Sequence, residues 1–200
     1  MPVTWGEVKQ AALQKLFAAR DGVSTTQANR EYMEGMSQAA NEGLALLCAE
    51  NLPLRRCFTV TVEAAGPRTV PLADLAADFW RAGEPEAYRR REDGRLVPAG
   101  GFAFAAGRLL IPESWRGEYE VWYDAAPPRL TDATPDSEEL PVEQQAAVIL
   151  PLYMASQLYK DDDSALATAY RNEFEAARAA LRPVNSGVRA ESWASLNGWA

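Results

Sequence analysis

The sequence contains no histidine and only two cysteines, and these shortages limit the chemistry that it can support. Without histidine, the chain cannot build a Ser-His-Asp or Cys-His catalytic centre or any metal site that depends on imidazole. Cys48 and Cys57 do not have the spacing of zinc ligands. In a chain without export signals, we expect both thiols to be reduced and buried. These shortages argue against a conventional hydrolase, and no catalytic residue, metal ligand or cofactor is assigned.

Long apolar runs are also missing. No stretch approaches the ~18 consecutive apolar residues that cross a bilayer. The N-terminal sequence MPVTWGEVKQ lacks the basic and then apolar pattern of a signal peptide. We therefore expect a soluble protein that is made and kept in the cytoplasm and has no membrane partner.

Positive charge is scarce, since 20 basic residues face 28 acidic ones and the net charge is -8. The acidic excess lies mainly in residues 131–200, whereas basic and acidic residues balance in residues 53–130. Binding to duplex DNA depends on clustered Lys and Arg, so the composition disfavours a protein that grips DNA. An acidic protein could still surround DNA without adhering to it.

Two segments near the N-terminus have helical spacing of apolar residues. Thr4 and Glu7 match a capping box, which predicts a helix from about Thr4 to Arg20. A polar turn region follows, and a second helix is predicted from about Asn29 to Glu50.

Beyond Pro53 the apolar period changes from helical to alternating. Phe58, Val60 and Val62 alternate with polar neighbours, which predicts a half-buried strand. Residues 101–112 have the pattern of a hairpin that turns at a glycine, and residues 119–123 predict a further strand. Residues 72–82 fit either a short helix or a loop. Residues 54–125 are therefore expected to form a small antiparallel sheet between helices.

Two more helices are predicted after a connector that is rich in proline and acidic residues. The third begins near Pro141 and is apolar on almost every side, so it should lie at the centre of the core. Pro151 within it predicts a kink or a break. The fourth carries an apolar stripe through Leu166, Tyr170 and Phe174 and stops at Pro183.

These patterns predict an α+β fold that is mainly α. We expect a four-helix bundle with an antiparallel β insertion between helices two and three and an extended C-terminal tail. The expected division is an N-terminal helical pair at 1–52, a β insertion at 53–130, a C-terminal helical pair at 131–182 and a docking tail at 183–200.

Three clusters are candidate sites. Asp161, Asp162 and Asp163 could bind a hard cation, although capping of the fourth helix explains them without a ligand. Arg89, Arg90, Arg91 and Arg95 could contact DNA phosphates or an acidic partner, or form a solvated loop with local ion pairs. Trp193, Leu196 and Trp199 could fold back onto their own domain or dock on another chain, where aromatic residues often anchor interfaces.

The helical segments resemble the head-to-tail adaptor (connector) proteins of tailed bacteriophages over roughly three-fifths of the chain. The segments that carry the resemblance are AANE at 39–42, the strand after Pro53, LPLY at 150–153, SQLYKDD at 156–162 and YRNEF at 170–174. The resemblance implies a structural virion protein without catalysis, found at the head-tail junction and assembled in the host cytoplasm. It implies a homo-oligomeric ring, commonly of twelve subunits, which lies between the portal protein and a tail or neck protein.

In such a ring, double-stranded DNA passes through the lumen without sequence-specific binding. Asp161, Asp162, Asp163 and Glu173 are then candidates for channel-facing acidic residues, and Trp193, Leu196 and Trp199 for contacts with the portal or a neighbouring copy. Two alternatives remain open at this stage. One is a metal-dependent enzyme that uses a carboxylate cluster, and the other is a DNA-binding regulator.

Overall fold

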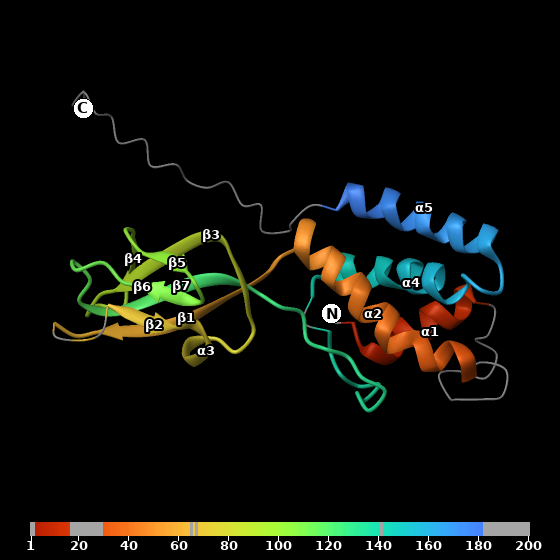
Figure 1. Cartoon of the computed structure of the whole chain (residues 1–200), viewed down its shortest axis with the longest axis horizontal. Coiled ribbons are helices and arrows are strands. Elements are labelled where there is room, and N and C mark those ends of the chain that lie inside the picture. The colour runs from red at the N-terminus through yellow and green to blue at the C-terminus, as the bar shows by residue number, and fades with distance from the viewer. Residues whose placement is uncertain (1–2, 17–29, 65, 67, 141, 182–200) are drawn as a thin grey trace, which may run out of the picture.

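A computed structural model describes residues 3–16, 30–64, 66, 68–140 and 142–181. The chain forms an elongated molecule with a helical unit at one end and a β unit at the other (Figure 1). The helical unit consists of α1 (Trp5–Lys15), α2 (Arg30–Glu50), α4 (Gln144–Leu158) and α5 (Ser164–Ala180). The β unit spans residues 54–125 and holds all seven strands and the short helix α3 (Leu72–Leu75).

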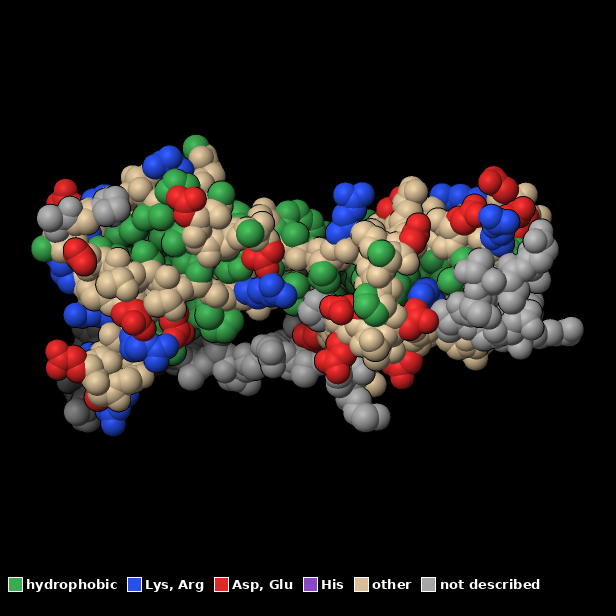
Figure 2. Space-filling model, turned by 90° about the horizontal axis from the view of Figure 1, so that it is seen from below, with side chains coloured by type: hydrophobic (Ala, Val, Ile, Leu, Met, Phe, Trp, Pro, Cys, Tyr) green, Lys and Arg blue, Asp and Glu red, His purple; other side chains and the backbone are tan. Residues whose placement is uncertain are grey.

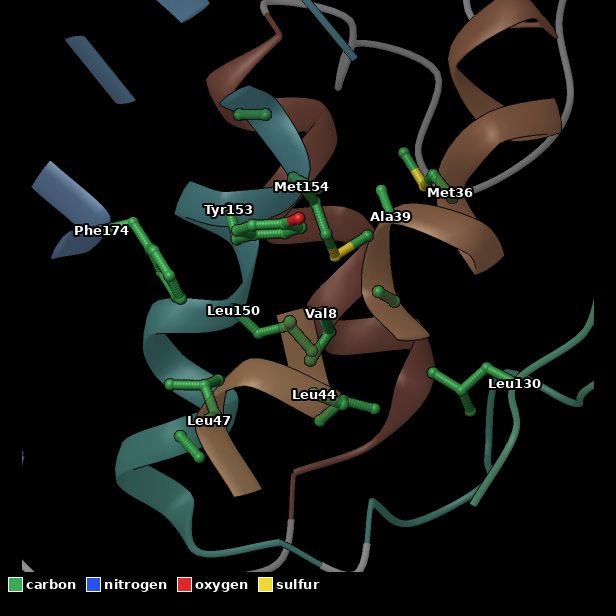
Figure 3. Packing of buried hydrophobic residues seen from close by; sticks show 14 of the residues in the cluster. Val8, Met36, Ala39, Leu44, Leu47, Leu130, Leu150, Tyr153, Met154 and Phe174 are labelled. Carbon is green, nitrogen blue, oxygen red and sulfur yellow. The ribbon is translucent and has the colours of Figure 1, made fainter. Parts of the chain in front are cut away.

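Helix α4 lies at the centre of the helical unit and is contacted by α1, α2 and α5. Leu150 and Met154 of α4 are fully buried. They point into a cluster with Leu44 and Leu47 of α2 and Phe174 of α5 (Figure 3). The sequence predicted this central position correctly, because a helix that is apolar on almost every side needs protein around it.

The predicted starts of the helices are largely confirmed. Thr4 caps α1, and its side chain and that of Glu7 exchange hydrogen bonds with the backbone, as a capping box requires. The predicted end of this helix at Arg20 lies outside the described residues. Pro151 is buried inside α4, and the helix continues through it to Leu158, so the predicted break is absent.

The β unit contains two antiparallel sheets. The larger one has the strand order β1 (Leu54–Val62), β7 (Gly117–Ala125), β3 (Phe79–Arg90) and β4 (Leu96–Ala99). The smaller one has the order β2 (Thr69–Pro71), β6 (Arg108–Leu110) and β5 (Ala103–Ala105). Their shared core contains residues from both sheets, among them Phe58, Val60, Leu109, Val121 and Tyr123.

The alternation that predicted the strands is confirmed from Phe58 to Val62 in β1 and from Tyr119 to Tyr123 in β7, where every second side chain is buried in this core. The predicted hairpin is β5–β6, which turns at Ala106 and Gly107 with φ angles of 48° and 71°. The expectation for the thiols is half right. Both cysteines are free and Cys48 is buried, but Cys57 is exposed because it lies on the face of β1 that points away from the core.

The predicted four-helix bundle with one β insertion is wrong. The described residues form five helices and two antiparallel sheets, with separate helical and β cores. Two features account for the difference. First, α1, α2 and α5 all pack against α4, whereas in a four-helix bundle the helices pack around a common central axis. Second, residues 69–75 and 103–110 form a second sheet and a short helix that cover the first sheet. The predicted division of the chain at residues 52, 130 and 182 remains a prediction.

The connector after β7 returns along the helical unit. Asn41 of α2 holds it with two hydrogen bonds of 2.8 Å, one to the carbonyl and one from the amide of Leu130. Further along, the amide of Trp5 donates to the carbonyl of Glu138 at 2.8 Å. The connector therefore forms part of the helical unit, and the AANE segment of α2 helps to position it.

Candidate interaction surfaces

The acidic turn between α4 and α5 is built from local hydrogen bonds. The carboxylate of Asp163 accepts from the amides of Ala165 and Leu166 at 3.0 Å each, which caps α5. Asp162 accepts a 2.6 Å hydrogen bond from the hydroxyl of Tyr32 and so ties the turn to the start of α2. Asp161 is exposed. The capping interpretation is confirmed for Asp163.

Removal of the Asp163 cap should weaken α5. We expect Asp163→Ala to lower the free energy of unfolding by about 1 kcal/mol, because two amides of the first turn lose their acceptor. Urea denaturation followed by circular dichroism measures the change. Asp161→Ala is the matched control, and an equal loss in both variants would contradict the assignment of the cap.

The Tyr32–Asp162 contact should make stability depend on pH. The hydrogen bond to Asp162, followed by burial, raises the pKa of Tyr32 from 10.0 to about 12. The folded chain therefore keeps this proton to higher pH than the unfolded chain, so the stabilisation is complete below pH 10 and is lost as the pH rises toward 12. Urea denaturation at a series of pH values should show this decline.

Tyr123 contributes a similar decline at high pH, because burial and a hydrogen bond to Asp78 raise its pKa to about 12. Tyr32→Phe should therefore reduce the decline without abolishing it. An unchanged pH dependence in this variant would show that the proton of Tyr32 does not contribute.

The arginine hairpin does not form a continuous basic patch. Arg90 pairs with Glu118 at 2.6 Å and also with Glu120, both on β7. Arg95 lies 3.6 Å from Asp93. Arg89 and Arg91 are exposed. The predicted solvated loop with local ion pairs fits Arg95 and Asp93, whereas Arg90 lies in β3 and its partners come from β7.

A charged cluster at the base of the larger sheet was not found from the sequence. Asp124 of β7 is 2% exposed, and its Oδ2 accepts a 2.9 Å hydrogen bond from Arg81 Nε. Arg55 Nε lies 3.7 Å from Oδ1, so the carboxylate joins β1, β7 and β3. Sequence reasoning missed the cluster because Asp124 looks like an ordinary polar residue at the end of a strand.

Gly83 makes room for this carboxylate. The residue has a φ of 60°, and a Cβ there would lie 2.5 Å from both carboxylate oxygens of Asp124. The pairing of β3 with β7 shifts register between Phe79 and Glu86, around this position. The irregular strand and the buried charge therefore belong to one arrangement, which fixes the base of the β unit.

Two further surfaces carry little charge. The exposed positions of α5 are mostly small or uncharged apart from Glu173, and the partly exposed Arg171 and Glu175 pair with each other at 2.6 Å. In the β unit, Ala103, Ala105 and Leu110 of the smaller sheet are exposed on its outer side. Figure 2 shows hydrophobic side chains over much of the β unit in that view. Both surfaces could pack against another chain.

The remaining candidates are placed as follows. Trp193, Leu196 and Trp199 lie outside the described residues. Glu173 is on α5, about three helical turns from the acidic turn that holds Asp161 to Asp163, so these four carboxylates do not form one cluster. Within the described residues, no group of three or more His, Cys, Asp or Glu side chains is arranged to hold a metal ion.

Comparison of the sequence with protein-family models and with curated proteins gives no match. In the part of the chain that the structure describes, no helix has both the length and the apolar character needed to span a membrane.

Proposed function

We propose that this protein is a structural component of a phage virion, an adaptor that forms a ring between the portal vertex and the tail. DNA passes through the lumen of this ring without sequence-specific binding. The proposal places the protein at the head-tail junction, with the portal and a tail or neck protein as partners. It starts from the family resemblance of the helical segments.

The observation that carries the proposal is the division of the chain into two units with separate cores (Figure 1). A subunit of a connecting ring has to contact its own copies and at least two other components. An elongated molecule with two independently packed ends offers separate surfaces for those contacts, and a closed ring repeats one heterologous contact between copies.

Charge distribution also supports the proposal. The connector residues 131–143 carry five acidic side chains and no basic one. Figure 2 shows acidic side chains, with basic ones among them, over the helical unit in that view. On α5, Glu173 is exposed, and the partly exposed Glu175 pairs with Arg171. Surfaces of this kind repel or ignore phosphates, which suits a channel that DNA must pass through freely.

Negative-stain imaging and light scattering of the full chain, alone and mixed with portal protein, test the proposal. We expect ring-shaped particles and a stable complex with the portal. A protein that stays monomeric at high concentration and has no affinity for the portal would overturn it.

A further inference from the structure

Strand β1 has a free edge. It pairs with β7 over its whole length, from Leu54 opposite Ala125 to Val62 opposite Gly117. On its other side, no strand or loop among the described residues forms a backbone hydrogen bond with residues 56–62. In an antiparallel pair, every second residue directs its N–H and C=O away from the partner, so these groups are available for another strand.

Beyond Arg55 and Arg56 at its start, this edge lacks the features by which proteins usually protect an edge strand. β4 has four residues with Pro98 among them, β2 has three with Pro71, and β5 has only three. β1 has nine residues, no proline and an unbroken register, and residues 57–62 carry no charge. Long, regular and uncharged edges tend to pair with a further strand.

The end of the described chain points to the segment that pairs with this edge. α5 ends beside the start of β1, since the side-chain amide of Asn51 donates to the carbonyl of Arg178 at 3.1 Å, and Arg178 pairs with Glu50 at 2.8 Å. Nineteen residues, 182–200, follow Leu181. Extended, they reach about 60 Å, whereas β1 is about 30 Å long, so the segment can leave its own subunit and still cover the strand.

The sequence of this segment suits a strand on β1. In an extended chain Trp193 and Trp199 share one side and Leu196 lies on the other. Phe58, Val60 and Val62 of β1 face the core and are 7%, 8% and 4% exposed at this edge. Leu196 would extend that row, and the two tryptophans would lie beside the exposed face of β1.

We propose that residues 183–200 of a neighbouring copy add a strand to the free edge of β1. The inference rests on the ring proposed above, in which each copy gives one strand and accepts one. This is a heterologous contact that closes around the ring. Trp193, Leu196 and Trp199 are then contacts between copies.

Cysteine cross-linking in assembled particles tests this pairing, because Cys57 is an exposed thiol on the outer face of β1. Rings are formed from wild-type chains mixed with a Cys57→Ser chain that carries Ser195→Cys, so a link can form only between copies. Ser195 shares the side of the two tryptophans, so we expect a covalent dimer after mild oxidation. The matched control carries Ala194→Cys in place of Ser195→Cys, and it should cross-link at least about ten-fold less because that side chain points to the opposite face.

Equal cross-linking of the two variants, or none in either, in rings that still form would overturn the strand pairing and leave the proposed function standing. A further experiment uses a chain that carries Ser195→Cys and keeps Cys57. If the introduced thiol at position 195 formed a disulfide with Cys57 of its own chain and no covalent dimers appeared, the added strand would come from the same chain and not from a neighbouring copy. Absence of rings and of portal binding would instead overturn the proposed function.

Discussion

Asp124→Ala is expected to lower the free energy of unfolding by about 2–3 kcal/mol. Removing one member of a buried charged group leaves its partners without compensation, a loss of about 3–5 kcal/mol when both charges are buried. Arg55 and Arg81 are 28% and 43% exposed, so water can compensate part of their charge after the change. The loss should therefore fall below the fully buried range. Urea denaturation followed by tryptophan fluorescence measures it.

Two further variants sharpen this test. Asp93→Ala removes the partner of Arg95 in the exposed hairpin, and it should change stability by less than about 0.5 kcal/mol because exposed pairs contribute little. Gly83→Ala should be destabilising without any change of charge, because its φ is 60° and its new Cβ would meet the Asp124 carboxylate. If Asp124→Ala were no worse than Asp93→Ala, the cluster would not fix the base of the β unit.

Much of the local structure could be predicted from the sequence, because it depends on neighbours in the chain. The Thr4–Glu7 capping box, the Asp163 cap and the alternation in β1 each involve residues a few positions apart. The central position of α4 also followed from composition alone, since an apolar helix can be stable in water only when other elements surround it.

The arrangement of the sheets could not be predicted in the same way. Alternation shows that residues 54–62 and 117–125 are strands, but it does not show that they pair with each other across more than fifty residues. The β5–β6 hairpin was predicted, but β2 has three residues, too few for a period to be recognised, and nothing in the sequence shows that it pairs with β6 in a second sheet. The bundle expectation failed because helical spacing identifies a buried face and not the number of helices around it.

The candidate sites show the same limit. Four arginines within seven positions suggested a basic patch, but the partners of Arg90 come from β7, about thirty residues further along the chain. Asp124 gave no signal because Arg55, Gly83 and Arg81 approach it only after the strands have paired. Charge that is neutralised or buried through tertiary contacts is not visible in a linear pattern.

Leu150→Ala is expected to have the largest effect of the changes considered, a loss of about 3–5 kcal/mol in the free energy of unfolding. Leu150 is fully buried on α4, the helix that contacts α1, α2 and α5, so the cavity would lie where all four helices meet (Figure 3). Its Cδ1 packs so closely against α2 that a Cβ at Gly43 would lie 2.6 Å from it, which shows how little space this site has. Deletion of a buried leucine removes both its transfer free energy and its packing contacts.

Val148→Ala on the same helix is the matched control for this change. Val148 is 63% exposed, so its truncation should alter stability by less than about 0.5 kcal/mol. Thermal and urea denaturation of both variants measure the difference, and the far-ultraviolet circular dichroism of the folded Leu150→Ala protein checks that its helices remain. Equal effects in the two variants would mean that the side of α4 that carries Leu150 is not the side packed against the other helices, since the fold buries Leu150 and leaves Val148 exposed.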